Sequence, residues 1–249
     1  MTDVIFFRAR DGVQLAYREM GEGEPVILVH GLFSSAEVNW IKFGTAAQLV
    51  AAGRRVIMPD LRAHGASDAP QEPAFYGPDV LAEDLEDLVA HLELAEFDLG
   101  GFSLGSRTSV RAVVRGMKPR RLMLGGMGLG GLAGWTRRSA FFQRVIAEYD
   151  TAKRGDDTWM SIQFMKTMKI DRVAASLLLD TFTDTAPEAL SAIIMPTLIV
   201  CGDQDQDNGS AQELADVLAH GILATIPGTH MSSVTMPELG AEMTAFLDQ

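Results

Sequence analysis

The chain has 249 residues and a mass of 26.9 kDa, and its 33 acidic and 21 basic side chains give a net charge of −12. With 47% hydrophobic and 22% charged residues, it has enough apolar material for the core of one large domain. This composition excludes a disordered tail, a collagen-like repeat and a highly charged linker. The acidic balance also makes nucleic acid and an anionic membrane surface poor candidate partners.

Three further features bear on location. The sequence contains no apolar run of about 18 residues, so no membrane-spanning helix is expected. Residues 1–4 lack the basic and apolar start of a signal peptide. Cys201 is the single cysteine and cannot form an internal disulfide, which favours a reducing compartment. We therefore expect a cytoplasmic protein.

Strand-like and helix-like segments alternate along most of the chain. Short apolar runs with β-branched residues indicate strands, and apolar residues three and four positions apart indicate helices. In chain order, the predicted elements are strands 4–8, 13–18 and 25–31, helix 36–52, strand 55–60, helix 78–94, strand 97–102, helix 103–116, strands 121–125 and 196–202, helix 211–219, strand 222–226 and helix 237–247.

This alternation predicts an α/β fold, a mainly parallel and doubly wound sheet of about eight strands joined by crossover helices. The first two strands have no helix between them and are expected to form an antiparallel edge. From residue 130 to residue 187 the alternation stops and the sequence is helix-like, which predicts an insertion of three or four helices above the sheet. The predicted core comprises residues 1–130 and 188–249, and the insertion comprises residues 131–187.

A candidate nucleophile lies in the pentapeptide Gly101-Phe102-Ser103-Leu104-Gly105. The G-x-S-x-G pattern alone is a weak signal, but here a predicted strand comes directly before the serine and a predicted helix directly after it. Such a turn strains the serine backbone and needs very small residues two positions before and after, which Gly101 and Gly105 supply. It also places Ser103 at a helix N-terminus, where unpaired amides favour a developing negative charge. The alternative is that Ser103 only caps the helix.

His230 is the candidate general base for this serine. It follows the predicted strand 222–226 through a short Pro-Gly-Thr turn, at the rim where parallel sheets bind ligands and where Ser103 is expected. His91 and His220 are interpreted as surface residues, and His30 as a structural residue of its loop.

An acidic residue is needed to orient the histidine and to stabilise its protonated form. The predicted strand 196–202 is followed by Asp203, Asp205 and Asp207. Asp205 is the preferred candidate, with Asp203 and Asp207 as alternatives. The two aspartates that do not contact the histidine are explained by a solvated acidic loop or a helix-capping cluster. The chain order Ser, Asp, His is typical of one fold among several that use this triad.

Acyl transfer also needs two N–H donors for the oxyanion. The backbone amide after the nucleophile, that of Leu104, is one candidate. The other is expected in the loop after the third strand, where Leu32 is the preferred donor.

With these residues in place, the sequence resembles the α/β-hydrolase superfamily over nearly its whole length. The motifs that carry the resemblance lie in family order at His30-Gly31 and at residues 60–67, 101–105, 202–205 and 228–230. The family's G-x-x-D pattern supports Asp205. The predicted insertion 131–187 lies where the family carries its cap domain, so the resemblance implies that it is a small helical cap. The family's loop at 60–67 is structural, so no chemistry is assigned to Asp60, Arg62 and His64.

A serine nucleophile implies acyl transfer, whereas dehalogenases and epoxide hydrolases of the family carry an aspartate at this position. The expected function is a serine hydrolase of the carboxylesterase type, which cleaves a small or medium carboxylic ester through an acyl-enzyme and needs no metal ion or cofactor. Its expected partner is a small-molecule ester or lactone substrate. An enol-lactonase, a carbon–carbon bond hydrolase and a perhydrolase share the triad and remain alternatives. A non-catalytic ligand receptor on the same fold is the alternative from another class.

Large apolar side chains, several of them in the insertion, suggest an apolar substrate pocket. The alternative is that they only pack the insertion against itself and the sheet. The residues predicted to line the pocket are Phe33, Trp135, Phe142, Trp159 and Met231.

Overall fold

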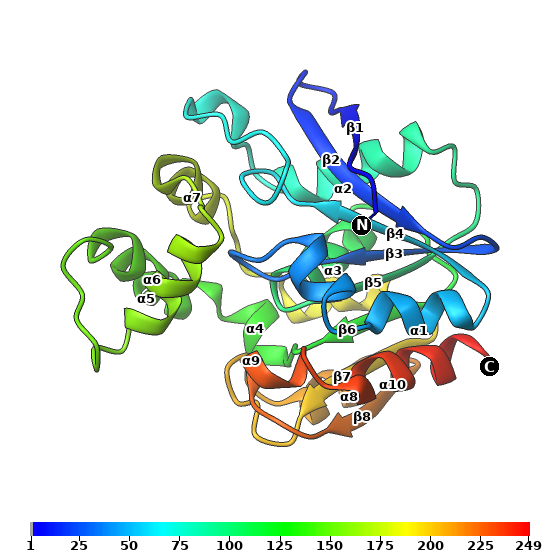
Figure 1. The fold of residues 1–249 in the computed structure, drawn as a ribbon. Coiled ribbons are helices and arrows are strands. Elements are labelled where there is room, and N and C mark those ends of the chain that lie inside the picture. Colours follow the sequence, from blue (N-terminus) through cyan, green and yellow to red (C-terminus); the bar gives the residue numbers. More distant parts are fainter. Residues whose placement is uncertain (1) are drawn as a thin grey trace.

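A computed structural model describes residues 2–249, apart from the side chains of residues 136 and 137. Eight strands form one twisted sheet (Figure 1). They are β1 (Ile5–Arg8), β2 (Gln14–Met20), β3 (Glu24–Val29), β4 (Arg54–Asp60), β5 (Asp98–Phe102), β6 (Leu122–Gly125), β7 (Thr197–Gly202) and β8 (Gly221–Ile226). The order across the sheet is β1-β2-β4-β3-β5-β6-β7-β8, and every pair from β4 to β8 is parallel. β1 and β2 form the antiparallel edge, so the predicted fold class is confirmed.

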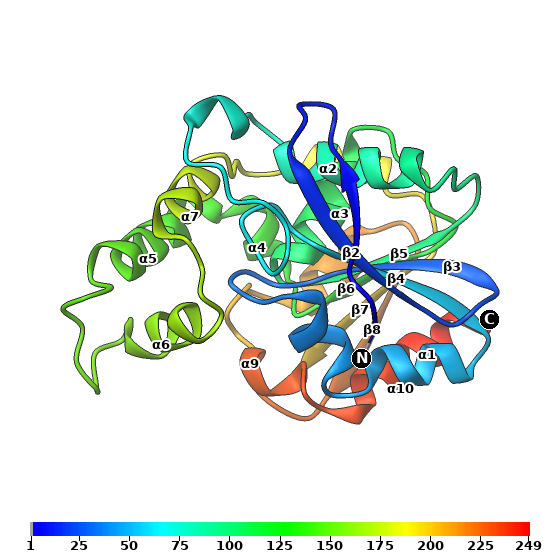
Figure 2. The ribbon, with the colours of Figure 1, turned by 45° about the horizontal axis from the view of Figure 1, so that its top comes forward.

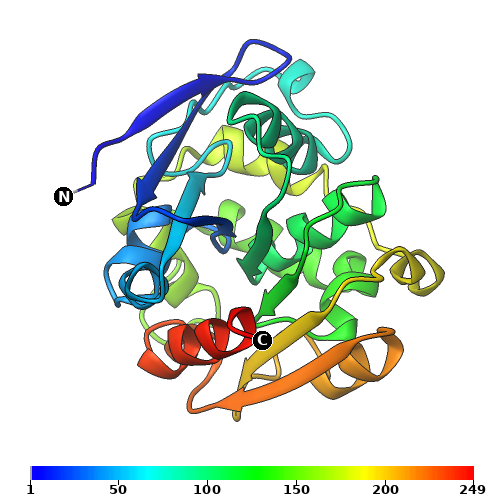
Figure 3. The ribbon, with the colours of Figure 1, turned by 90° about the vertical axis from the view of Figure 1, so that its right-hand side faces the viewer.

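Helices cover both faces of the sheet. One face carries α1 (Thr45–Ala51) and α10 (Pro237–Leu247), which lie side by side in Figures 1 and 3. The other face carries α2 (Val80–His91), α3 (Leu104–Val114) and α8 (Ala211–Val217). This arrangement is the doubly wound sheet that the alternating sequence predicts.

The sequence of β3 shows why both faces are covered. Val26 and Leu28 belong to the apolar core beneath α1 and α10, whereas Ile27 and Val29 belong to the core beneath α2 and α3. All four side chains are fully buried. Because side chains of a strand alternate between faces, an unbroken apolar run marks a strand buried on both sides.

The predicted helix 36–52 is wrong in one respect, because the structure divides it. A π-helical turn, η1, covers Glu37–Ile41, and α1 begins only at Thr45. Gly44 lies between them with a φ of 89°. A residue in this left-handed conformation cannot continue a right-handed helix, and only glycine adopts it at no cost.

Four helices lie in and beside the interval where an insertion is predicted. They are α4 (Leu129–Ala133), α5 (Trp135–Ala147), α6 (Trp159–Thr167) and α7 (Arg172–Leu179). Figures 1 and 2 show α5, α6 and α7 grouped together beyond one end of the sheet. They share a separate apolar cluster that includes Val145, Ile162 and Met165.

Three short helical turns complete the description: η2 (Pro73–Phe75), η3 (Pro187–Ala192) and α9 (His230–Ser233). Among the described residues, no helix has both the length and the apolar character needed to cross a bilayer.

Candidate active site

Ser103 lies at a sharp turn between β5 and α3. Its φ of 54° and ψ of −111° are strained values for a residue with a side chain, and its amide donates to the Gly125 carbonyl at 2.8 Å. A Cβ at Gly101 would overlap the Gly105 carbonyl group, and a Cβ at Gly105 would overlap the Val29 carbonyl group. The two glycines of the pentapeptide therefore allow the backbone to approach closely enough to present Ser103.

His230 and Asp205 meet Ser103 in one hydrogen-bonded chain. The Nε2 atom of His230 lies 2.9 Å from the Ser103 Oγ, and its Nδ1 atom lies 2.8 Å from the Asp205 Oδ2. Both His230 and Asp205 are buried, and the His230 ring packs against the Phe102 ring at 5.2 Å between centroids. This arrangement can pass the serine proton to the imidazole while the carboxylate fixes the imidazole tautomer.

The three aspartates after β7 have different surroundings. Asp205 is buried, and its second carboxylate oxygen accepts the Asp207 amide at 3.1 Å. Asp203 is exposed and accepts the Gly228 amide at 2.8 Å, which ties the β7 loop to the loop after β8. Asp207 is also exposed. Of the three, Asp205 is the one that bonds the imidazole.

Leu32 and Leu104, whose backbone amides are the predicted oxyanion donors, lie beside Ser103. Both residues line the same cavity as Ser103, and Leu104 is the first residue of α3. Among the described residues, neither amide has a hydrogen-bond acceptor. An oxyanion hole requires two unpaired N–H groups, and these two amides stay the candidates for it.

Two buried histidines shape the loop that carries Leu32. His30 donates from Nδ1 to the Gly31 carbonyl at 2.7 Å and accepts the Leu61 amide at Nε2 at 3.0 Å. His64 likewise donates to the Arg62 carbonyl and accepts the Phe33 amide at 3.0 Å. In each ring one nitrogen donates a hydrogen bond and the other accepts one. Both imidazoles are therefore neutral, and both have a structural role.

These two rings should make the protein sensitive to mild acid. Burial lowers the pKa of His30 to about 4 and that of His64 to about 3, below the value of 6.5 for a free side chain. The unfolded chain therefore binds more protons as the pH falls below 6.5, and each histidine should remove about 1 kcal/mol of stability per pH unit until its folded pKa is reached.

Urea unfolding of the wild type and of His64→Gln between pH 7 and pH 5 checks this expectation. The amide of glutamine keeps a donor and an acceptor but does not titrate. As the pH is lowered, the unfolding free energy of the variant should fall less steeply than that of the wild type. The difference in slope should equal the contribution of one histidine, about 1 kcal/mol per pH unit. Parallel curves for the two proteins would contradict the assignment.

The run 60–67 is structural, as the family resemblance implies. Asp60 accepts the Ala36 amide at 2.8 Å and the Ala66 amide at 2.9 Å. Arg62 is buried and forms a two-point ion pair with Asp84. Neither side chain lines the cavity beside Ser103.

That cavity is small, with a volume of about 30 Å³. Two of the predicted pocket residues, Trp135 and Phe142 of α5, line it and stack on each other with centroids 5.6 Å apart. The other three predicted lining residues lie outside it: Phe33, Trp159 and Met231.

These three placements correct the pocket prediction, and each has a physical reason. Phe33 is buried in the apolar cluster of the insertion, where its ring meets the edge of Phe142. Trp159 begins α6, whose apolar residues pack against α5 rather than over Ser103. Met231 follows His230 on α9 and is 59% exposed, because successive helical residues point about 100° apart and His230 faces inward.

Sequence reasoning missed three polar residues that line this cavity: Arg107, Arg138 and Asn208. Asn208 is buried, donates to the Gly126 carbonyl at 2.6 Å and accepts a hydrogen bond from Arg138. Arg107 is one turn beyond Ser103 on α3, a spacing that places it on the face of the helix near the serine. That spacing could have identified Arg107 from the sequence. Arg138 and Asn208 belong to elements distant in the chain, and no comparable sequence signal points to them.

Asp205, Asp207 and His230 form the one described group whose donor atoms lie close enough, within 4.8 Å, to hold a metal ion. The His230 Nδ1 atom is already bonded to the Asp205 carboxylate. The group is therefore better explained as an oriented imidazole than as a ligand set, since an ion would have to replace the Nδ1 proton.

Comparison with known proteins agrees with this architecture. The sequence model of a family described as the alpha/beta hydrolase fold matches residues 24–122. A non-heme chloroperoxidase of Kitasatospora aureofaciens is 36% identical over 111 residues, which are 43% of this chain and 37% of that protein. The chain thus spans about a third of the length of the first curated relatives that it matches. A non-heme haloperoxidase of Rhodococcus erythropolis is 27% identical over 98% of this chain and 99% of its own.

Solved structures resemble the whole chain. An esterase from Exiguobacterium antarcticum superposes with a TM-score of 0.80 at 19% identity, over 98% of this chain and 99% of its own. The enol-lactonase of Burkholderia xenovorans superposes with a TM-score of 0.75 at 20% identity, over 98% of this chain and 100% of its own. Fold, motif order and sequence matches agree: the whole chain has the α/β-hydrolase fold, and its residues 24–122 match the sequence model of that family.

Proposed function

We propose that the protein is a serine hydrolase that cleaves a small or medium carboxylic ester or lactone. Ser103 attacks the carbonyl carbon, and His230 takes the serine proton and returns it to the leaving alcohol. Asp205 orients His230, and the amides of Leu32 and Leu104 hold the oxyanion. Water, activated by His230, then releases the acyl group.

The observation that carries this proposal is the pair of contacts made by His230, 2.9 Å to Ser103 and 2.8 Å to Asp205. A structural serine or histidine does not need both contacts in one chain, whereas general-base catalysis does. The strained backbone of Ser103 supports it further, because such strain persists only where the surroundings enforce it.

A perhydrolase is the second candidate, and the names of two relatives favour it: a non-heme chloroperoxidase and a non-heme haloperoxidase. In that reaction hydrogen peroxide replaces water as the second nucleophile, and the acyl group leaves as a peracid. Peracid formation from acetate and peroxide, followed by bromide oxidation, would distinguish it from simple ester hydrolysis. Lactone and diketone substrates test the enol-lactonase and carbon–carbon hydrolase alternatives in the same way.

Labelling with a fluorophosphonate tests whether Ser103 is activated. We expect one covalent adduct per chain, located by mass spectrometry on Ser103, because only a serine with a general base and an oxyanion site reacts readily with this reagent. Denatured protein is the control and should not react. A native protein that gains no adduct would support the non-catalytic receptor instead.

A further inference from the structure

Two guanidinium groups border the cavity beside Ser103, that of Arg107 buried and that of Arg138 half-buried. Arg107 donates to the carbonyl groups of Gly131, Leu132 and Thr183, and Arg138 donates to the amide oxygen of Asn208. Arg107 also lies over the Trp135 ring and Arg138 over the Phe142 ring, at 5.6 and 5.7 Å. Within the described part of the chain, neither guanidinium forms an ion pair with a carboxylate.

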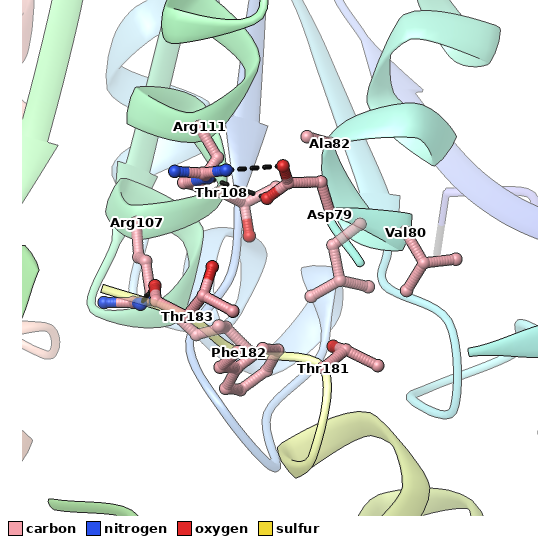
Figure 4. A pocket seen from close by; sticks show the side chains of 11 residues that line it. Asp79, Val80, Ala82, Arg107, Thr108, Arg111, Thr181, Phe182 and Thr183 are labelled. Carbon is pink, nitrogen blue, oxygen red and sulfur yellow. Dashed lines mark hydrogen bonds and ion pairs between the residues drawn. The ribbon is translucent and has the colours of Figure 1, made fainter. Parts of the chain in front are cut away.

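Arg111 provides a contrast on the same helix. It lies one turn beyond Arg107 on α3 and binds both carboxylate oxygens of Asp79, with Nε 2.7 Å from Oδ1. Figure 4 shows this pair, and it shows the Arg107 side chain running away from it towards Thr183. Arg111 therefore has a direct carboxylate partner, whereas Arg107, which borders the Ser103 cavity, has none within ion-pair distance among the described residues.

An unpaired charge in such a place is costly. Burial lowers the pKa of Arg107 to about 10 and also lowers the pKa of Arg138, although the nearby acids, Asp184 for Arg107 and Asp207 and Asp205 for Arg138, favour their charged forms. Arg107 therefore remains a cation at neutral pH. Among the described residues no carboxylate lies within ion-pair distance of either guanidinium, so the carboxylate of a ligand can supply the direct contact that the protein does not.

Arg107 and Arg138 differ in how much of this role they can take. Arg107 already donates hydrogen bonds to backbone carbonyl groups at both ends of the insertion. Its acceptors are Gly131 and Leu132 at one end and Thr183 at the other. Arg138 has one described hydrogen-bond partner, Asn208, and a guanidinium has five N–H groups. Arg138 thus has the free donors, and Arg107 adds positive charge beside it.

We propose that the substrate of Ser103 carries a carboxylate in addition to the ester or lactone bond, and that Arg138 binds this carboxylate. The inference rests on the proposed function, because it assigns a substrate class to that same site. The net charge of −12 would repel an anion at a distance, so the local guanidinium must provide the attraction. With so little open space, binding must also displace cap side chains such as Phe142.

Matched ester pairs test the proposal on the intact wild-type protein. One pair carries the charge on the acyl side, the mono-p-nitrophenyl ester of adipic acid and its methyl-capped form. The other carries it on the leaving group, 4-acetoxybenzoate and its methyl ester. For at least one pair, kcat/KM should favour the free carboxylate about 10- to 100-fold, the range that a hydrogen bond between charged groups contributes.

Arg138→Met, which keeps an unbranched side chain and removes the charged group, should bring that preference close to one. Arg144→Met is the matched control, because Arg144 lies on the same helix but is exposed and pairs with Glu148 and Asp157. The control should keep the wild-type preference. If Arg138→Met does not fold, Arg138→Lys, which keeps the charge but loses the fork of donors, should retain part of the preference.

The outcomes separate this inference from the proposed function. Ester hydrolysis that depends on Ser103 but shows no preference for the carboxylate in either wild-type pair would overturn the inference alone. A preference that survives Arg138→Met would overturn the assignment to Arg138. Hydrolysis that does not depend on Ser103 would overturn the proposed function. Calorimetric titration of adipate into Ser103→Ala and into Ser103→Ala/Arg138→Met then measures carboxylate binding without catalysis, with weaker binding expected for the double variant.

Discussion

Replacing Ser103 with alanine should lower kcat for p-nitrophenyl esters by at least about 10⁴-fold. The Ser103 hydroxyl is the one described serine oxygen within hydrogen-bonding distance of the His230 imidazole, at 2.9 Å. Without it no acyl-enzyme can form, and the oxyanion amides alone support only slow attack by water. Initial rates with acetate and butyrate esters, together with loss of the fluorophosphonate adduct, measure the effect.

Ser109→Ala is the control for this substitution. Ser109 lies on the same helix α3, is fully buried, and donates within the helix to the Gly105 carbonyl at 2.8 Å. Loss of its hydroxyl should lower the stability by about 1 kcal/mol and leave kcat within a few-fold of the wild type. Turnover by Ser103→Ala that is close to normal would contradict the proposed mechanism, whatever the control shows.

The elements that the sequence predicts best are those with a strong local cause. The strand β5 and the helix α3 are recognisable on either side of Ser103, because an apolar run and a helical spacing meet at the glycines that the turn needs. The end of β8 places His230 at the same rim, since parallel strands bring their carboxyl ends together. A local pattern and one topological rule were therefore enough to place Ser103 and His230 together, whereas the choice of Asp205 among three aspartates needed the family resemblance.

The cavity lining has no comparable local cause. Arg138 lies on α5 of the insertion and Asn208 in the turn after β7, so both reach the cavity only through the tertiary arrangement of distant elements. Trp159 has the same apolar character as Trp135, yet only Trp135 lines the cavity. Which large side chain faces the substrate depends on how the helices of the insertion pack, and hydrophobicity alone does not encode that.

Asp205→Asn should lower kcat by about 10³- to 10⁴-fold, which would make it the most damaging of the three aspartate-to-asparagine changes after β7. The asparagine amide can donate to the His230 Nδ1 atom, which in the wild type donates to the Asp205 carboxylate at 2.8 Å. That bond would hold the imidazole in the tautomer with its proton on Nε2, which cannot accept the proton of Ser103. The altered site also loses the negative charge that stabilises the imidazolium.

Asp203→Asn and Asp207→Asn are matched controls within the same loop. Asp203 accepts the Gly228 amide through an oxygen that asparagine also provides, and Asp207 contributes only its backbone amide to Asp205. Both variants should keep kcat within about tenfold of the wild type, because neither change alters the tautomer of His230. A large loss in Asp203→Asn or Asp207→Asn with a small loss in Asp205→Asn would move the acid to a neighbouring position. Similar small losses in all three would show that His230 is oriented without a carboxylate, and that hydrogen bond would then be structural rather than catalytic.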